Sequence, residues 1–200
     1  MDQRFFFEHR AYLWITLISD LRAIDTNVSM LRPDDTASVV LFNHNVTKAR
    51  TIGRNEHVAD LFGEVVPSGG TSLRDALASI RSSDRTYAIV ITDGGDRNSE
   101  LSDEEALRRI STTRTLVDAI ILGDHSTFLD RAAKNTGGEV VRASVRNVSD
   151  ALRDAIADIN SRYLAVYQSH GTPRGWRTID VTSRLRGVTI LAARKGYFAE

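Results

Sequence analysis

The sequence contains no cysteine and only three prolines among its 200 residues. The absence of thiols excludes a disulfide framework, a zinc site built on thiolates and a cysteine nucleophile, although it leaves the cellular compartment open. Any metal ion in this protein would have to be held by oxygen atoms or by histidine side chains.

The chain also lacks an excess charge of either sign and an apolar run long enough to cross a bilayer. Lysine and arginine number 26, as do aspartate and glutamate, so the total charge favours neither nucleic acid nor an anionic membrane as a partner. The apolar stretch of residues 11–21 is interrupted by polar side chains and is shorter than the roughly 20 residues of a membrane span. Charged residues follow Met1, so we expect no signal peptide in this chain.

The middle of the chain alternates between apolar runs of strand length and segments with helical spacing. We expect strands over residues 37–42, 87–92, 117–122 and 139–141, and helices over residues 57–66, 73–80, 102–110, 126–132 and 148–159. Ser102 with Glu105 forms a capping box, and Gly137 is placed to end a helix. Repeated strand-then-helix units predict a largely parallel sheet with helices on both faces.

The two ends of the chain depart from this alternation. Apolar residues recur at steps of three or four between Leu13 and Leu31, which predicts one long first helix. Residues 46–52 are expected to pair with the strand 37–42 as a hairpin at the sheet edge. After Asn160, three antiparallel strands are expected, over residues 163–167, 176–182 and 188–194. We therefore divide the chain into an α/β domain, residues 1–160, and a β-strand extension packed on it, residues 161–200.

Five segments resemble the von Willebrand factor A (vWA) family, and in particular bacterial members with a β-rich C-terminal extension. They are residues 31–43, Gly69-Gly70-Thr71, Thr92-Asp93-Gly94, Thr136-Gly137-Gly138 and Arg194-Lys195-Gly196-Tyr197. The resemblance covers nearly the whole chain. It implies a Rossmann-like α/β fold and a module that binds a protein partner and is not an enzyme.

The resemblance also implies a binding edge. In the family a divalent ion, usually Mg²⁺, lies at the carboxyl-terminal edge of the sheet in the metal-ion-dependent adhesion site, and a partner protein presents a carboxylate to it. The resemblance assigns Thr71 as a hydroxyl ligand and Asp93 as a carboxylate ligand of Mg²⁺ or Mn²⁺. The partner-binding loops would hold Gly69, Gly70, Thr71, Asp93, Gly94 and Gly95.

One family motif has no counterpart here. The largest ligand set of the adhesion site, Asp-x-Ser-x-Ser, follows the first central strand, and nothing in the sequence matches it. We therefore expect that first strand to be missing from the sheet and Met1 to be an internal methionine of a longer protein. We expect metal binding to be weak or absent in this chain and complete only in the full-length form, whose relatives are often extracytoplasmic.

Simpler interpretations stand beside these assignments. Thr71 also suits a plain helix N-cap, and Asp93 suits a turn before two glycines. Asp96 is interpreted as a solvated loop carboxylate or a cap, and Asp34 with Asp35 as a turn rather than as a catalytic pair. The five histidines show no ligand spacing and are expected to be surface or packing residues.

Three hypotheses for function follow. The first is a partner-binding module whose metal site is incomplete in this chain. The second is a metal-free scaffold domain. The third is a metal-dependent phosphohydrolase that uses Asp93, against which stands the lack of the further acids and the lysine that such chemistry needs.

Overall fold

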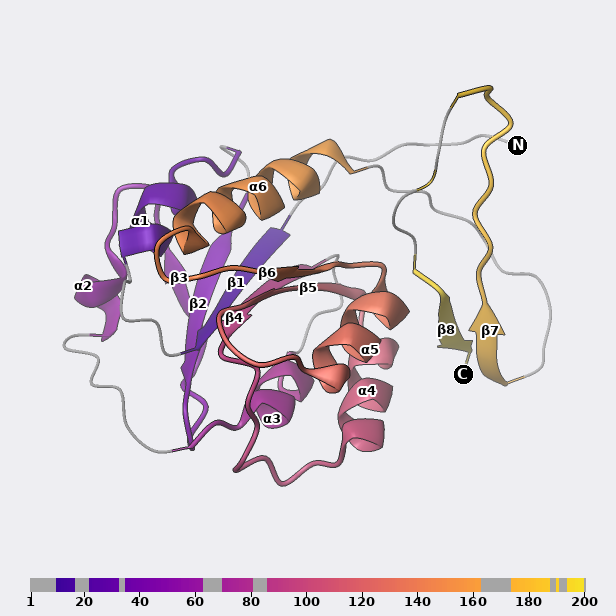
Figure 1. Cartoon of the computed structure of the whole chain (residues 1–200), viewed down its shortest axis with the longest axis horizontal. Helices are drawn as coiled ribbons and strands as arrows, with labels where there is room; N and C mark the ends of the chain where they lie inside the picture. The colour runs from indigo at the N-terminus through magenta and orange to yellow at the C-terminus, as the bar shows by residue number, and fades with distance from the viewer. Residues whose placement is uncertain are drawn as a thin grey trace.

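The computed structural model describes residues 10–16, 22–32, 35–62, 70–80, 86–162, 174–187, 190 and 194–199. A six-stranded sheet forms the centre of the molecule (Figure 1), in the order β3-β2-β1-β4-β5-β6. Its strands are β1 (Arg10–Thr16), β2 (Ala37–Phe42), β3 (Arg50–Ile52), β4 (Thr86–Thr92), β5 (Thr115–Ile121) and β6 (Val140–Arg142). All neighbours are parallel except β2 and β3, which form an antiparallel pair.

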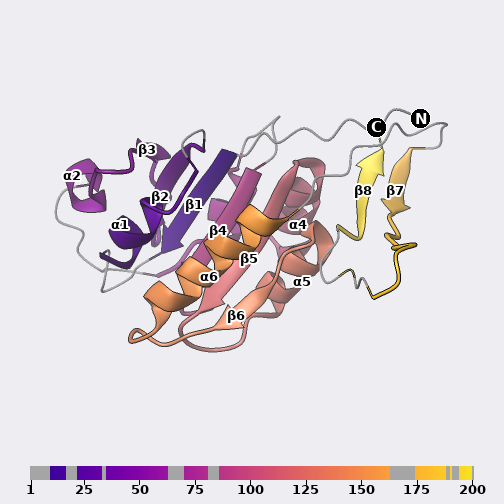
Figure 2. The same ribbon diagram turned by 90° about the horizontal axis from the view of Figure 1, so that it is seen from above.

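Helices cover both faces of the sheet (Figure 2), as the alternation of the sequence predicts. They are α1 (Arg22–Val28), α2 (Val58–Phe62), α3 (Leu73–Ala78), α4 (Asp103–Thr112), α5 (Thr127–Thr136) and α6 (Val148–Ser161). Successive residues of β4 point to opposite faces. Ile89 and Ile91 pack with α1 and α6 in one apolar cluster, and Ala88 and Val90 pack with α3, α4 and α5 in the other. The result is a three-layer α/β fold.

The expected long first helix is wrong over residues 13–16, and residues 17–21 lie outside the described residues. Residues Arg10–Thr16 form strand β1, which pairs with β2 on one side and β4 on the other, and the described part of α1 covers Arg22–Val28. Tyr12, Trp14 and Ile15 are residues that favour strands. A place between two parallel strands satisfies the backbone of β1 on both sides, and this pairing outweighs the helical spacing that includes Leu13.

The expected gap at the centre of the sheet is therefore also wrong. β1 occupies the place between β2 and β4 where the first strand was predicted to be missing. Its neighbours do not have to pair across a gap or leave their backbone groups unpaired at this position.

The C-terminal extension contains an antiparallel pair, β7 (Gly175–Thr178) and β8 (Gly196–Ala199). β7 overlaps the predicted strand 176–182 but begins one residue earlier and ends at Thr178. The predicted strand 188–194 is wrong where it is described, because Ile190 and Arg194 lie outside strands and the partner of β7 begins at Gly196. The predicted strand 163–167 lies outside the described residues.

The predicted edge hairpin and helix ends are confirmed. β3 pairs with β2 between Ile52 and Ala37. The Ser102 hydroxyl accepts a hydrogen bond from the Glu105 amide at 3.2 Å, and α5 ends at Gly137 in the left-handed conformation. Within the described residues, no helix is long and apolar enough to cross a membrane.

Candidate functional site at the carboxyl-terminal edge of the sheet

Thr71 lies where the loops that follow β2 and β4 meet. Its carbonyl oxygen accepts hydrogen bonds from the amides of Arg97 and Asn98, both at 3.0 Å. The next residue, Ser72, donates from its amide to the Asn43 carbonyl oxygen at 2.6 Å, in the loop after β2. Because β2 and β4 are both parallel to β1, these loops share the carboxyl-terminal edge of the sheet.

Thr71 is not the N-cap of α3, which decides against the plain capping interpretation. The N-cap is Ser72, whose hydroxyl hydrogen-bonds the His44 carbonyl oxygen and caps no amide of the helix. The Thr71 side chain is half-buried and makes no hydrogen bond to another described residue. Gly70 directly precedes Thr71 in this loop, and a Cβ atom on residue 70 would lie 1.5 Å from the Asn98 Oδ1 atom. Gly69 lies outside the described residues.

Asp93 follows the last residue of β4 and is exposed. Its Oδ1 atom accepts a hydrogen bond from the Gly95 amide at 3.0 Å. Gly94 has a φ of +90°, and a Cβ there would lie 2.2 Å from the Asp124 carbonyl oxygen in the loop after β5. The turn interpretation of Asp93 therefore holds for one of its oxygens. A glycine is required at position 94 because its φ is positive and because the loop after β5 approaches it closely.

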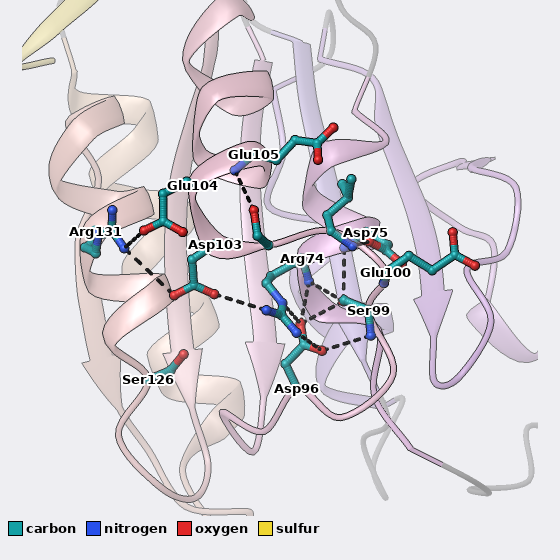
Figure 3. A network of polar contacts seen from close by, with 12 residues as sticks. Arg74, Asp75, Asp96, Ser99, Glu100, Asp103, Glu104, Glu105, Ser126 and Arg131 are labelled. Carbon is teal, nitrogen blue, oxygen red and sulfur yellow. Dashed lines mark hydrogen bonds and ion pairs between the residues drawn. The ribbon is translucent and has the colours of Figure 1, made fainter.

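Arg74 and Asp96 lock the Thr71 loop to the Asp93 loop (Figure 3). Asp96 Oδ2 accepts from the Arg74 amide at 2.8 Å and from its Nε at 3.0 Å. Ser99 donates from its hydroxyl to the same oxygen at 2.8 Å. Burial raises the pKa of Asp96, but the hydrogen bonds from Arg74 and Ser99 outweigh it and hold the pKa below its usual value. Asp96 therefore caps α3, as one of its two interpretations predicted, and it is not a solvated carboxylate.

The network continues outward to α4 and α5. Asp75 accepts hydrogen bonds from the amides of Glu100 and Leu101, at 2.9 and 3.1 Å. The Arg74 Nη1 atom lies 3.3 Å from Asp103 Oδ1, and Arg131 lies 3.2 Å from Glu104 Oε1. Figure 3 shows these side chains bridging α3, the loop after β4 and the first turn of α4. The loop that begins at Asp93 is thus held at several points, which limits its movement.

Replacing Asp96 with alanine is expected to lower the free energy of unfolding by about 1–2 kcal/mol near neutral pH, because the Arg74 amide in the first turn of α3, the Ser99 amide and the Arg74 guanidinium lose their acceptor. The pKa of Asp96 is lower in the folded state, so its stabilisation is present above the pKa of the unfolded chain and is lost as the pH falls. Urea unfolding of the wild type and of Asp96→Ala, at neutral and at acidic pH, measures this loss of stability. Asp60→Ala, at an exposed aspartate, is the control; an equal loss in both variants would contradict the assignment.

The described residues do not make a complete magnesium site. Among them, no group of three or more histidine, aspartate or glutamate side chains is placed to hold a metal ion. Thr71 and Asp93 supply two oxygen donors, whereas Mg²⁺ prefers octahedral coordination. The family motif would follow β1, where the sequence instead has Leu17-Ile18-Ser19-Asp20-Leu21, which lies outside the described residues.

Other residues singled out in the sequence have structural roles where they are described. Asp35 Oδ2 accepts a hydrogen bond from the Arg32 amide at 3.0 Å, as the turn interpretation predicts. His44, His57 and His125 are exposed, in agreement with the prediction. Asp34, His9 and His170 lie outside the described residues.

Sequence reasoning missed a buried ion pair. Asp118, in the middle of β5, has a side chain only 8% exposed and lies 3.5 Å from Arg162 Nη2. Burial raises the pKa of Asp118 to about 6, although Arg162 acts in the opposite direction. Arg162 also donates to the Gly137 carbonyl oxygen at 2.8 Å, so it joins the end of α6 to β5 and to the end of α5. The one signal in the sequence is an acid inside an apolar run.

Comparison with solved structures identifies the fold. A von Willebrand factor type A protein from Catenulispora acidiphila superposes with a TM-score of 0.60 at 18% identity, over 75% of this chain and 42% of that chain. The ArnB paralog VWA2 from Sulfolobus acidocaldarius gives 0.59 at 12% identity, over 76% and 46%. BatB from Bacteroides thetaiotaomicron, described as a conserved hypothetical protein, gives 0.54 at 14% identity, over 76% and 99%.

The chain therefore has the α/β fold of vWA domains, as the sequence motifs predicted. No family model and no curated protein matches the sequence. The chain spans less than half of the Catenulispora and Sulfolobus proteins, and nearly all of BatB. These likenesses show the fold, and the function has to be argued from the site.

Proposed function

We propose that this chain is a protein-interaction module that binds its partner at the carboxyl-terminal edge of the sheet, through Gly70 and Thr71 and through the loop from Asp93 to Gly95. The observation that carries the proposal is the joining of these loops. The Thr71 backbone is bonded to the Asp93 loop, and the Arg74–Asp96 pair holds both loops to α3. An exposed carboxylate and an available hydroxyl thus stand on a pre-organised surface, which lowers the entropic cost of binding.

The proposal includes a divalent metal ion, but only one that this chain binds weakly. With Thr71 and Asp93 as donors, we expect Mg²⁺ or Mn²⁺ to bind this chain weakly or not at all, because residues 17–21, which follow β1, do not match Asp-x-Ser-x-Ser. The expectation of a complete site in a longer form does not fit this place of β1, because the motif position lies within the present chain. A partner carboxylate would need such an ion, because Asp93 is itself negative and would repel it. The metal-free scaffold is therefore the alternative within the same class of function.

The test uses capture of partners from an extract of the source cells, followed by a binding titration of each captured protein. We expect at least one partner to bind the wild-type chain and to bind Thr71→Ala and Asp93→Ala roughly tenfold more weakly or worse. Asp60→Ala, which removes an exposed carboxylate from α2, should bind like the wild type. If every captured protein bound all four chains equally, the proposed surface would be wrong.

A chelator separates the two forms of the proposal. Binding that is lost with chelator and restored by Mg²⁺ or Mn²⁺ supports a metal-mediated contact, and binding that ignores chelator supports the metal-free scaffold. Thermal unfolding with added Mg²⁺ is the companion measurement, and we expect little stabilisation of this chain. The phosphohydrolase alternative gains no support from Asp96, the next acid in the loop, because Arg74 already engages it.

A further inference from the structure

Basic and acidic residues are unevenly distributed along the chain, although their numbers are equal. The C-terminal extension, residues 161–200, contains seven basic residues and two acidic residues, whereas residues 1–160 contain 19 basic and 24 acidic residues. The C-terminal extension is thus a basic element attached to an acidic body. Arg174, Arg184, Arg186 and Lys195 are exposed, and none of the four forms an ion pair with another described residue.

The same element exposes large apolar side chains. Four of the seven exposed large hydrophobic residues in the described part of the chain are Trp176, Val181, Leu185 and Ile190. Leu185 is the most exposed of them, at 73%. Single exposed apolar residues are ordinary on protein surfaces, but several in one short segment mark an interaction surface.

A tight turn presents Leu185 between two arginines. The Leu185 amide donates to the Ser183 hydroxyl at 3.1 Å, and Gly187 has a φ of +77°, which ends the turn. The side chains of Arg184 and Arg186 are exposed on either side of Leu185. The apex of the turn therefore combines one apolar side chain with two cations.

The extension lies away from the proposed partner-binding edge. Arg194 donates to the carbonyl oxygens of Ser111 and Thr113, at 2.5 and 3.0 Å, beside the end of α4 and just before β5 begins. This is the amino-terminal edge of the parallel strands, whereas Asp93 follows the carboxyl end of β4. Figures 1 and 2 both show β7 and β8 at the end of the molecule opposite α2.

We propose that residues 174–187 of the extension dock the protein on the surface of an anionic phospholipid bilayer, with Leu185 entering the interface and the exposed Arg174, Arg184 and Arg186 contacting the headgroups. Charge complementarity carries this choice, because Arg184 and Arg186, which form no ion pair with another described residue, flank the exposed Leu185. Trp176 suits the boundary between headgroups and acyl chains. A bilayer accepts such side chains without a matching groove. Nucleic acid would leave the exposed aliphatic residues in water, since it is bound through phosphate contacts and base stacking.

The test is sedimentation of the whole chain with vesicles, using phosphatidylcholine mixed with phosphatidylglycerol in one arm and phosphatidylcholine alone in the other. We expect binding to the anionic vesicles, weakened by salt, and little binding to the neutral ones. The Arg184→Gln/Arg186→Gln variant should bind about 25-fold more weakly, at about fivefold for each cation. Leu185→Ser should bind about tenfold more weakly, because its side chain no longer enters the interface.

The chain offers a matched control in β6 and the loop after it. Arg142, Val145 and Arg146 are also exposed, with Val145 at 55%, so Arg142→Gln/Arg146→Gln and Val145→Ser remove the same kinds of group elsewhere. These variants should bind anionic vesicles like the wild type, as should Thr71→Ala and Asp93→Ala. Equal binding to neutral vesicles, no binding to either, or an equal loss in the control variants would overturn the proposal. The thermal unfolding midpoint of each variant shows that it is folded.

Discussion

Replacing Arg162 with methionine is expected to lower the free energy of unfolding by roughly 3 kcal/mol near pH 8, and by clearly less near pH 5. Arg162 faces Asp118, whose pKa burial raises to about 6. Above that pH the folded protein holds a buried carboxylate, and without Arg162 this charge loses its compensating partner. Below that pH Asp118 is protonated in the folded state, so the loss of Arg162 removes its hydrogen bond to Gly137 and its ion pair with Asp158 but no longer leaves a buried charge without a partner.

The Asp118 carboxyl group also decides whether the stability of the wild-type protein rises or falls with pH. The folded pKa of Asp118 lies above its ordinary value, so the folded state holds the proton more tightly than the unfolded state between about pH 4 and pH 6. Over that interval the contribution of Asp118 to stability falls as the pH rises, by at most about 1.4 kcal/mol per unit. The neighbouring acids Asp158 and Glu139 act in the same direction, and Arg162 opposes them.

Urea unfolding across this pH range, on four chains, tests the pair. They are the wild type, Asp118→Asn, Arg162→Met and the double variant. Asparagine keeps an oxygen that can accept from the Glu139 amide, which lies 2.8 Å from Asp118 Oδ1, but it cannot ionise. In the Asp118→Asn background the cost of Arg162→Met should therefore no longer depend on pH. A cost that is the same at every pH in the wild-type background would show that the two side chains do not interact as charges.

Replacing Ile91 with alanine is expected to cost about 2–5 kcal/mol, because loss of a fully buried side chain near the carboxyl end of β4 leaves a cavity. Ile91 packs in the cluster with α1 and α6 and lies two residues before Asp93. The loss should also loosen the strand end that positions the Asp93 loop. Urea unfolding measures the first effect, and hydrogen exchange of the Thr92 to Gly95 amides measures the second.

Two further variants calibrate the Ile91 result. Ile91→Val removes one methylene group and should cost about 0.5–1.5 kcal/mol. Val141→Ala, at an exposed position of β6, should change stability by less than about 0.5 kcal/mol. If Ile91→Ala were as mild as Val141→Ala, β4 would not be the packed centre of the sheet.

The strands that the sequence predicted best are those buried on both faces. Residues 37–42, 87–92 and 117–122 were expected, and the strands run over Ala37–Phe42, Thr86–Thr92 and Thr115–Ile121. A continuous apolar run between polar loops identifies such a strand without any knowledge of its neighbours. The same reasoning missed β1 because Leu13 also continues the apolar spacing of α1, and the pairing that decides the conformation of β1 involves residues far away in the sequence.

The candidate site was predictable only through its motifs. Thr71 and Asp93 follow from a resemblance to family loops, but the pairs that fix those loops do not. Arg74 and Asp96 are separated by 22 residues, and Asp118 and Arg162 by 44. Arg74, Asp96 and Arg162 each have the character of an ordinary surface charge in the sequence, and only Asp118 stands out, as an acid inside an apolar run. The fold is what brings the opposite charges together.

The two outer strands of the sheet, β3 and β6, are only three residues long, and each has an exposed arginine, Arg50 and Arg142. A second copy or an extended peptide that added a strand beside either one would gain few main-chain hydrogen bonds and would have to accommodate a cation. Short edge strands with a charged residue protect this largely parallel sheet against growth into fibrous aggregates.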